Sequence, residues 1–197
     1  MFVTSLGRLW RHTPELRRRA GMQALLFAGF SLLWTGAPME LVGRCALGAD
    51  EIALFGLVGG TGALIAPLAR RLADRGKGRT TSLIGVIAVV AAFILTAFAT
   101  HVWMLAIAAI AINAGVQANH VISQRAILAI RPDAASRLNS LYIAIFFLGG
   151  AAGSAIAAPL SFTGWTHLGL LGAAIGFIAL VLWTTDVRAA LPAQVAQ

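Results

Sequence analysis

The chain has 197 residues, of which 59% are hydrophobic and 11% charged, and its mean hydropathy is +0.84. A soluble domain carries charge on roughly a quarter of its residues, so this composition excludes an ordinary water-soluble domain. The formal net charge of +8 lies in short basic clusters between long apolar runs. This distribution argues against a basic nucleic-acid-binding face, and no nucleic-acid partner is expected.

Six apolar stretches are each long enough to cross a bilayer as a helix, which takes about twenty residues. They comprise residues 20–43, 51–73, 80–99, 102–128, 138–160 and 165–185. The first stretch is too long for the apolar core of a secretory signal and lacks a small-x-small cleavage site, so we expect it to remain in the mature protein. The sequence therefore predicts an all-α integral membrane protein whose transmembrane domain covers residues 20–185.

Two segments flank the predicted transmembrane domain. Residues 1–19 mix leucine and tryptophan with arginine, which suits a helix on an anionic membrane surface, although a disordered arm fits equally. Residues 186–197 form a short tail. Basic residues near span ends are retained in the cytoplasm, and fourteen of the fifteen lysines and arginines lie on one side, with only Arg44 on the other. With six spans, both termini are predicted to be cytoplasmic.

A repeated pattern suggests that the six spans are two sets of three. Residues 59–68 read GGTGALIAPL and residues 149–160 read GGAAGSAIAAPL, each in the middle span of its set. Because three is an odd number, a duplicated triplet would be inverted, which predicts a 3+3 inverted repeat. Close helix packing could also explain the match, since it favours small residues. The positions predicted to pack against neighbouring helices are Gly59, Ala63, Gly149, Gly153 and Ala157.

The fourth span carries a stripe of polar side chains. Asn113, Gln117, His120 and Gln124 step by four, three and four residues, which places them on one helix face. Polar groups inside a bilayer usually face the bundle interior or a wet cavity, so the stripe predicts a cavity-lining face. Separate interhelical hydrogen bonds are the alternative interpretation. His120 could also carry a proton near neutral pH.

Two residues of the first span are further candidates. Trp34 could face the same cavity or fill the core. Glu40, two residues after Pro38, could titrate and couple transport to protons if it is buried, whereas an interfacial and solvated carboxylate would not.

The loop between the second and third spans reads RRLADRGKGR over residues 70–79. This resembles the loop signature of the major facilitator superfamily, roughly G-x-L-A-D-R-x-G-R-R. Its acidic, basic, glycine and basic positions are matched by Asp74, Arg75, Gly78 and Arg79. Arg70 replaces the first glycine of the signature, and one extra residue separates Arg75 from Gly78. In this family the element acts as a conformational latch.

The resemblance extends over almost the whole chain. Residues 115–160 look like the tenth and eleventh helices of bacterial drug or sugar efflux permeases, and residues 5–20 (SLGRLWRHTPELRRRA) look like the end of their central loop. The resemblance implies helices seven to twelve of a proton-coupled antiporter in the bacterial inner membrane. Its partners would be the lipid bilayer, protons, a small-molecule substrate and either an N-terminal six-helix half or a second copy of the chain.

A chain with one half of such a transporter could instead be a truncated, non-transporting remnant or a structural membrane subunit. The start at Met1 within a linker-like segment favours truncation. An enzyme is not expected, because Ser154 lacks the following glycine that an intramembrane serine protease requires. The sequence suggests no metal site and no cofactor.

Overall fold

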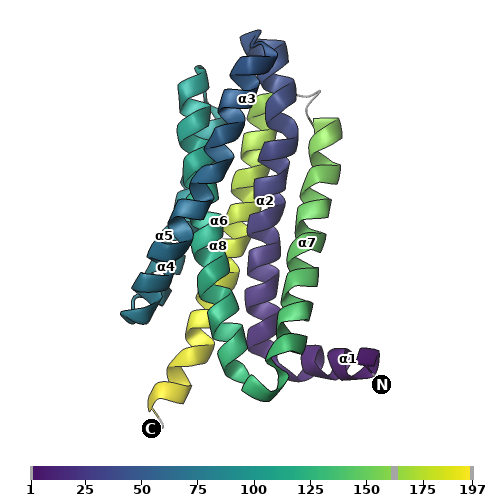
Figure 1. Cartoon of the computed structure of the whole chain (residues 1–197), viewed down its shortest axis with the longest axis vertical. Coiled ribbons are helices and arrows are strands. Elements are labelled where there is room, and N and C mark those ends of the chain that lie inside the picture. Colours follow the sequence, from purple (N-terminus) through teal and green to yellow (C-terminus); the bar gives the residue numbers. More distant parts are fainter. Residues whose placement is uncertain (1, 161–163, 196–197) are drawn as a thin grey trace.

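The computed structural model describes residues 2–160 and 164–195, which are helical apart from short connections (Figure 1). In chain order the elements are α1 (Phe2–His12), α2 (Pro14–Cys45), α3 (Ala49–Leu57), the 3₁₀ turn η1 (Val58–Gly60), α4 (Thr61–Asp74), α5 (Gly78–Ala97), α6 (Val102–Ile130), the 3₁₀ turn η2 (Pro132–Ala134), α7 (Ala135–Leu160) and α8 (Trp165–Val195).

Six stretches of this helical chain are long and apolar enough to cross a membrane. They cover Pro14–Gly43, Ala49–Asp74, Gly78–Ala97, Val102–Ile130, Pro132–Leu160 and Trp165–Asp186. The prediction of an all-α protein with six spans is confirmed. Large apolar side chains on the outside, such as Leu57 and Leu64, are more than two-thirds exposed, as expected where lipid or another helical unit replaces water.

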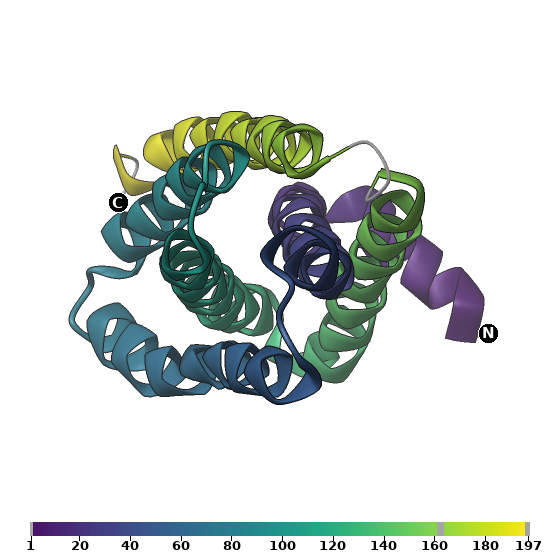
Figure 2. The same ribbon diagram turned by 90° about the horizontal axis from the view of Figure 1, so that it is seen from above.

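The other spans pack around two central ones, α2 and α6. Figure 2 shows α8 and the α3–α4 span on opposite sides of α2 and α6. The contacts form matched pairs: α2 packs on α7 as α6 packs on α4, α2 on α8 as α6 on α5, and α5 contacts α8. Exchanging α2 with α6, α4 with α7 and α5 with α8 maps each of these five contacts onto another of them or onto itself. The pattern agrees with a 3+3 inverted repeat.

Glycines allow several of these helices to approach backbone to backbone. A Cβ atom on Gly149 or Gly153 of α7 would overlap the backbone of Ala24 or Ala28 of α2. Gly85 of α5 and Gly115 of α6 make a similar close approach, which the sequence analysis did not identify. Without a hydrophobic effect between helices in lipid, such close van der Waals contact is a main source of helix association.

The other predicted packing positions divide between two roles. Ala157 is fully buried, and Gly59 lies against the Trp34 ring, where an added Cβ would be 3.3 Å from the nearest ring carbon. Ala63 is exposed and lines a hollow between helices. It therefore does not occupy the close helix contact that was predicted for it.

The second span is broken, whereas the sequence predicts a continuous helix over residues 51–73. The 3₁₀ turn Val58–Gly60 separates α3 from α4, in the stretch that contains Gly56, Gly59 and Gly60. Glycine costs about 0.8–1.0 kcal/mol more than alanine in a helix interior, so this stretch favours the regular helix least. A 3₁₀ stretch within a helix often marks a hinge.

Candidate functional site

A hollow of about 270 Å³ lies between α2, the α3–α4 span, α6 and α7. Aromatic rings from two helices, Phe27 and Phe30 of α2 and Phe146 of α7, form much of its wall. The Phe27 and Phe146 rings stack with centroids 3.9 Å apart. On the α3–α4 side the wall has only small residues around the η1 turn, so the α6 side chains opposite can reach the hollow.

The polar stripe on α6 does not act as one unit. Asn113, Gln117 and His120 line the hollow, but Gln124 lies further along α6, where its Nε2 donates to Asn139 Oδ1 of α7 at 2.9 Å. The first three residues thus border the hollow, and the fourth forms an interhelical hydrogen bond. Gln117 makes no hydrogen bond with any residue that the structure describes.

Asn113 is only 2% exposed and joins three helical segments. Its Oδ1 accepts a hydrogen bond from Trp34 Nε1 of α2 at 3.1 Å, and its Nδ2 donates to the Val58 carbonyl of the η1 turn at 3.0 Å. Trp34 is half-buried against Gly59 with its indole N–H satisfied, and it is not among the residues that line the hollow. Asn113 fixes the orientation of this ring and the position of the break in the second span.

His120 is half-buried and makes contacts to α7. The Tyr142 hydroxyl lies 3.1 Å from His120 Nδ1, and either group can donate depending on the imidazole tautomer. The ring also packs on Phe146, with centroids 5.0 Å apart. Among the described residues that line the hollow, His120 is the titratable one.

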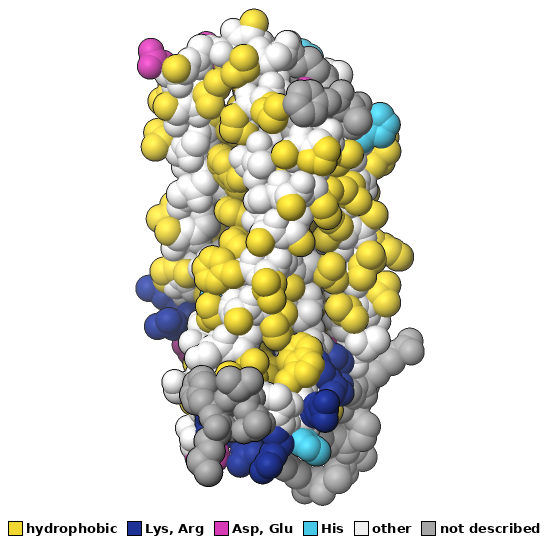
Figure 3. Space-filling model, turned by 90° about the vertical axis from the view of Figure 1, so that its right-hand side faces the viewer, with side chains coloured by type: hydrophobic (Ala, Val, Ile, Leu, Met, Phe, Trp, Pro, Cys, Tyr) yellow, Lys and Arg dark blue, Asp and Glu magenta, His cyan; other side chains and the backbone are white. Residues whose placement is uncertain are grey.

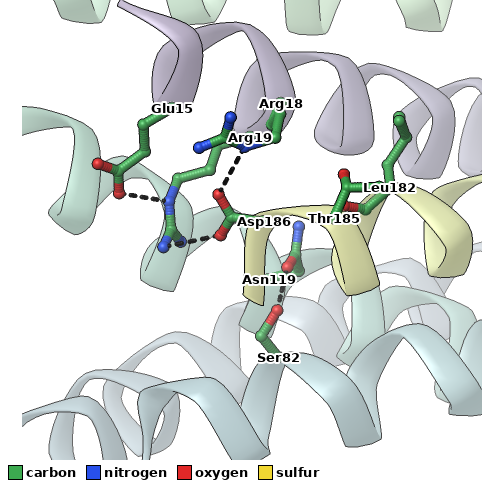
Figure 4. Close-up of polar contacts among 8 residues, drawn as sticks. All are labelled: Glu15, Arg18, Arg19, Ser82, Asn119, Leu182, Thr185 and Asp186. Atoms are coloured by element: carbon green, nitrogen blue, oxygen red, sulfur yellow. Dashed lines mark hydrogen bonds and ion pairs between the residues drawn. The ribbon is translucent and has the colours of Figure 1, made fainter. Parts of the chain in front are cut away.

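A buried polar network behind the hollow was not predicted. Ser82 Oγ of α5 donates to Asn119 Oδ1 of α6 at 2.6 Å, and Asn119 Nδ2 donates to Gln23 Oε1 of α2 at 2.6 Å (Figure 4 shows the Ser82 contact). Gln23 Nε2 in turn donates to the Val116 carbonyl at 3.3 Å. The one sign of this network in the sequence was Asn119, which directly precedes His120 of the stripe. Its partners, Ser82 and Gln23, lie in other spans, so no spacing along the chain connects them to it.

The loop signature closes α4 and connects it to α6. Asp74, the last residue of α4, forms an ion pair with Arg125 of α6, and both side chains are about half exposed. Gly76 has a left-handed φ of 75°, which allows its N–H to bond the Ala73 carbonyl at 3.0 Å and the next N–H, of Lys77, to bond the Leu72 carbonyl at 2.9 Å. This is a Schellman ending, and it accounts for the extra residue in the loop.

The remaining signature positions lie at the start of α5. Gly78 begins that helix beside Ala73 and Ile122. Arg75 and Arg79 are exposed and form no ion pair with a residue that the structure describes. Arg70, which replaces the first glycine of the signature, is exposed and lies near Gln124 and Arg125 in a second surface hollow.

A cluster of ion pairs joins the start of α2 to the C-terminal part of α8. Arg19 of α2 bonds both Glu15 at 2.9 Å and Asp186 of α8 at 3.0 Å, and Arg18 reaches the same Asp186 carboxylate at 3.3 Å (Figure 4). Asp186 is only 13% exposed, so two arginines neutralise a largely buried carboxylate. This cluster holds the start of the first span against the end of the last.

Glu40 lies apart from the hollow. It is half-buried near the far end of α2, beside a space of about 10 Å³ that Cys45, His101 and Trp165 also line. A space of this size admits at most about one water molecule. Within the described residues, no group of three or more His, Cys, Asp or Glu side chains is placed to hold a metal ion.

Comparison with known proteins identifies the family. The family model described as Major Facilitator Superfamily matches residues 19–197. The chain belongs to this superfamily. No solved structure matches the chain.

The chain is also similar to curated proteins from two bacteria. "Uncharacterized transporter YgaY" of Escherichia coli O157:H7 is 38% identical over 171 residues, which cover 85% of this chain and 43% of the relative. "Probable transporter SCO4007" of Streptomyces coelicolor is 31% identical over 191 residues, covering 95% of this chain and 44% of the relative. The chain thus spans less than half the length of the curated relatives it matches.

Proposed function

We propose that this chain is one six-helix half, equivalent to helices seven to twelve, of a proton-coupled efflux transporter for small drug-like or sugar-like molecules. The observation that carries the proposal is the hollow shared by four of the six spans. Binding sites of secondary transporters lie near the bilayer midplane between structural repeats, and one half supplies one wall of such a site. A second six-helix unit over this face would supply the other wall.

The side chains around the hollow suit a small amphipathic molecule. Small-molecule sites are mainly apolar and aromatic, with a few polar groups that set orientation. Here Phe27, Phe30 and Phe146 supply the apolar surface, and Gln117 supplies an amide with no competing partner among the described residues. Asn113 is already satisfied by Trp34 and Val58, so its part is to hold the wall in place rather than to bind substrate.

We place the proton-coupling role on His120 rather than on Glu40. His120 lines the hollow and contacts the Tyr142 hydroxyl, whereas Glu40 borders a space too small for a substrate. An imidazole changes charge near neutral pH, so its protonation could compete with a substrate for the same cavity. The bacterial relatives support a location in a bacterial inner membrane. The asymmetry of basic residues supports an orientation with both termini in the cytoplasm.

Cysteine labelling tests whether the hollow is part of a water-filled path. After Cys45→Ser removes the background thiol, Gln117→Cys and His120→Cys should react with a small water-soluble thiol reagent, because thiolate formation requires water. Ile112→Cys is the control, because Ile112 of the same helix is 0% exposed and packs in the apolar core of the bundle. Asn113→Cys should react slowly, because that position is buried.

The labelling is compared between the chain alone and the chain coexpressed with an N-terminal six-helix half. Protection of Gln117→Cys and His120→Cys in both samples would contradict a wet path along α6. A transport assay in vesicles, with a pH-sensitive dye and a panel of amphipathic cations and sugars, then separates the functions. Proton flux driven by one of these solutes supports the exporter, whereas labelling without flux under any condition supports a structural subunit or a remnant.

A further inference from the structure

A large pocket of about 690 Å³ lies at the end of the bundle where both termini are found, away from the hollow. Its walls come from α1, the start of α2 and the connection between α6 and α7. Basic side chains dominate its polar lining: Arg8 and His12 from α1, and Arg131 and Arg137 from the α6–α7 region. Neither the transport path nor the loop signature uses this pocket.

Two of the arginines around the pocket carry charges that no residue described by the structure neutralises. Arg131 pairs with Asp133 at 3.3 Å, and the acidic residue of the lining, Glu15, is already bonded to Arg19 at 2.9 Å. Arg8 and Arg137 form no ion pair with any residue in the described ranges. Two guanidinium groups without an ion pair in those ranges, one from α1 and one from α7, therefore line the same pocket. Guanidinium groups bind phosphate oxygens through paired, charge-assisted hydrogen bonds.

The pocket also lies at the boundary between apolar and basic surface. In Figure 3 the dark blue Lys and Arg side chains gather at the lower end, below the yellow apolar band of the spans. In Figure 1, α1 lies across the direction of the bundle, like a helix parallel to a membrane surface. Leu9 of α1 is 8% exposed and packs in a cluster with Leu16, Leu138 and Tyr142, which holds α1 against the bundle.

We propose that this pocket binds the phosphate headgroup of an anionic phospholipid. The unpaired guanidinium groups of Arg8 and Arg137 would bind the phosphate oxygens. The apolar part of the wall, Leu9, Ile130 and Ala134, would contact the glycerol and the first acyl carbons. This apolar wall distinguishes a lipid from free phosphate, which would gain nothing from it. A bound lipid would hold α1 against the α6–α7 connection.

The experiment measures binding of short-chain phosphatidylglycerol to the full chain in a neutral detergent. Short-chain phosphatidylcholine tests the need for net negative charge, and soluble glycerol 3-phosphate tests the need for the lipid. The test variant is Arg8→Gln/Arg137→Gln. The matched control is Arg11→Gln, because Arg11 is exposed on the same helix but does not line the pocket. Both variants remove basic charge from the same end of the molecule.

We expect phosphatidylglycerol affinity to fall about tenfold or more in the double variant, because both guanidinium groups lose their charge-assisted hydrogen bonds to the phosphate. Arg11→Gln should change it less than twofold, and the other two probes should bind at least tenfold more weakly than phosphatidylglycerol. Should the double variant not fold, Arg137→Lys keeps the charge without the planar fork and should still weaken binding several-fold. An equal loss in Arg11→Gln, or glycerol 3-phosphate binding as tightly as the lipid, would overturn the proposal.

Discussion

The contact between α2 and α7 gives the sharpest test of the structure, through the substitution Gly153→Ala. An ideal Cβ at this position would lie 2.7 Å and 2.8 Å from the carbonyl carbon and Cα of Ala28, and closer still to its carbonyl oxygen. These atoms are backbone and cannot rotate away. Because carbon atoms pack at about 3.5–4.0 Å, the two helices would have to separate by about 1 Å.

The cost of this separation follows from the contacts that it weakens. A gap of 0.5–1 Å forfeits about a quarter to a half of each van der Waals contact, and overpacking typically costs about 1–3 kcal/mol. We expect the free energy of unfolding to fall by about 1–3 kcal/mol. Gly43→Ala is the control, because Gly43 is in α2 with no atom within 4 Å of its Cβ position. There the better helix propensity of alanine should stabilise the chain by up to about 1 kcal/mol.

The sole cysteine makes the measurement simple. Cys45 is half-buried, so a dye that becomes fluorescent on reaction with thiols reports unfolding as detergent-solubilised protein is heated. Gly153→Ala should lower the transition temperature and Gly43→Ala should leave it equal or higher. The separation would also widen the stacked pair Phe27 and Phe146, and so the hollow between them. If the two variants have the same transition temperature, α2 and α7 are not packed backbone to backbone.

Three further outcomes are expected. Asn119→Leu should lower the transition temperature measured with the same dye. The substitution removes the hydrogen-bond partners of the buried Gln23 amide and the Ser82 hydroxyl, and each unsatisfied group costs about 1–3 kcal/mol. Asp74→Asn in a complete transporter should reduce solute flux far more than protein level, since an exposed ion pair contributes only about 0–1 kcal/mol to stability; equal losses would indicate a folding role. A reporter fused at Gly76 should report cytoplasm, and an outside signal there would reverse the orientation.

Composition and length were sufficient to predict the six spans, because lipid requires each segment to satisfy its own backbone hydrogen bonds. The break at Val58–Gly60 was not predicted, although the glycines around it were visible. Hydropathy does not distinguish a regular helix from one with a 3₁₀ turn, since both are equally apolar. What stabilises the turn is a contact from Asn113, which lies 55 residues further along the chain.

The polar residues show the same limit at the level of side chains. The period of the stripe predicts Gln117 and His120 on one helix face, and in the structure both line the hollow. The period could not show that Asn113 is satisfied by other spans, or that Gln124 bonds to Asn139. Spacing defines a face of one helix, but the partners of that face depend on how distant spans pack.

Two polar contacts of different strength join the α3–α4 span to α6. Their difference determines which end of α4 can move if the loop acts as a conformational latch. At the η1 turn, Asn113 Nδ2 donates a part-buried hydrogen bond to the Val58 carbonyl, and at the end of α4 the exposed Asp74 pairs with Arg125. Between these two contacts, a Cβ atom added to Gly62 would lie 3.7–3.8 Å from atoms of Asn113 and Gln117, which is ordinary van der Waals contact. Water competes more strongly for the exposed ion pair than for the part-buried hydrogen bond, so α4 can release from Arg125 at a cost of about 0–1 kcal/mol while the span stays held at Val58. The 3₁₀ turn beside Val58 is then the place where the resulting tilt would be absorbed. Such a tilt would move Gly59 and Ala63, and with them the wall of the hollow that faces Gln117.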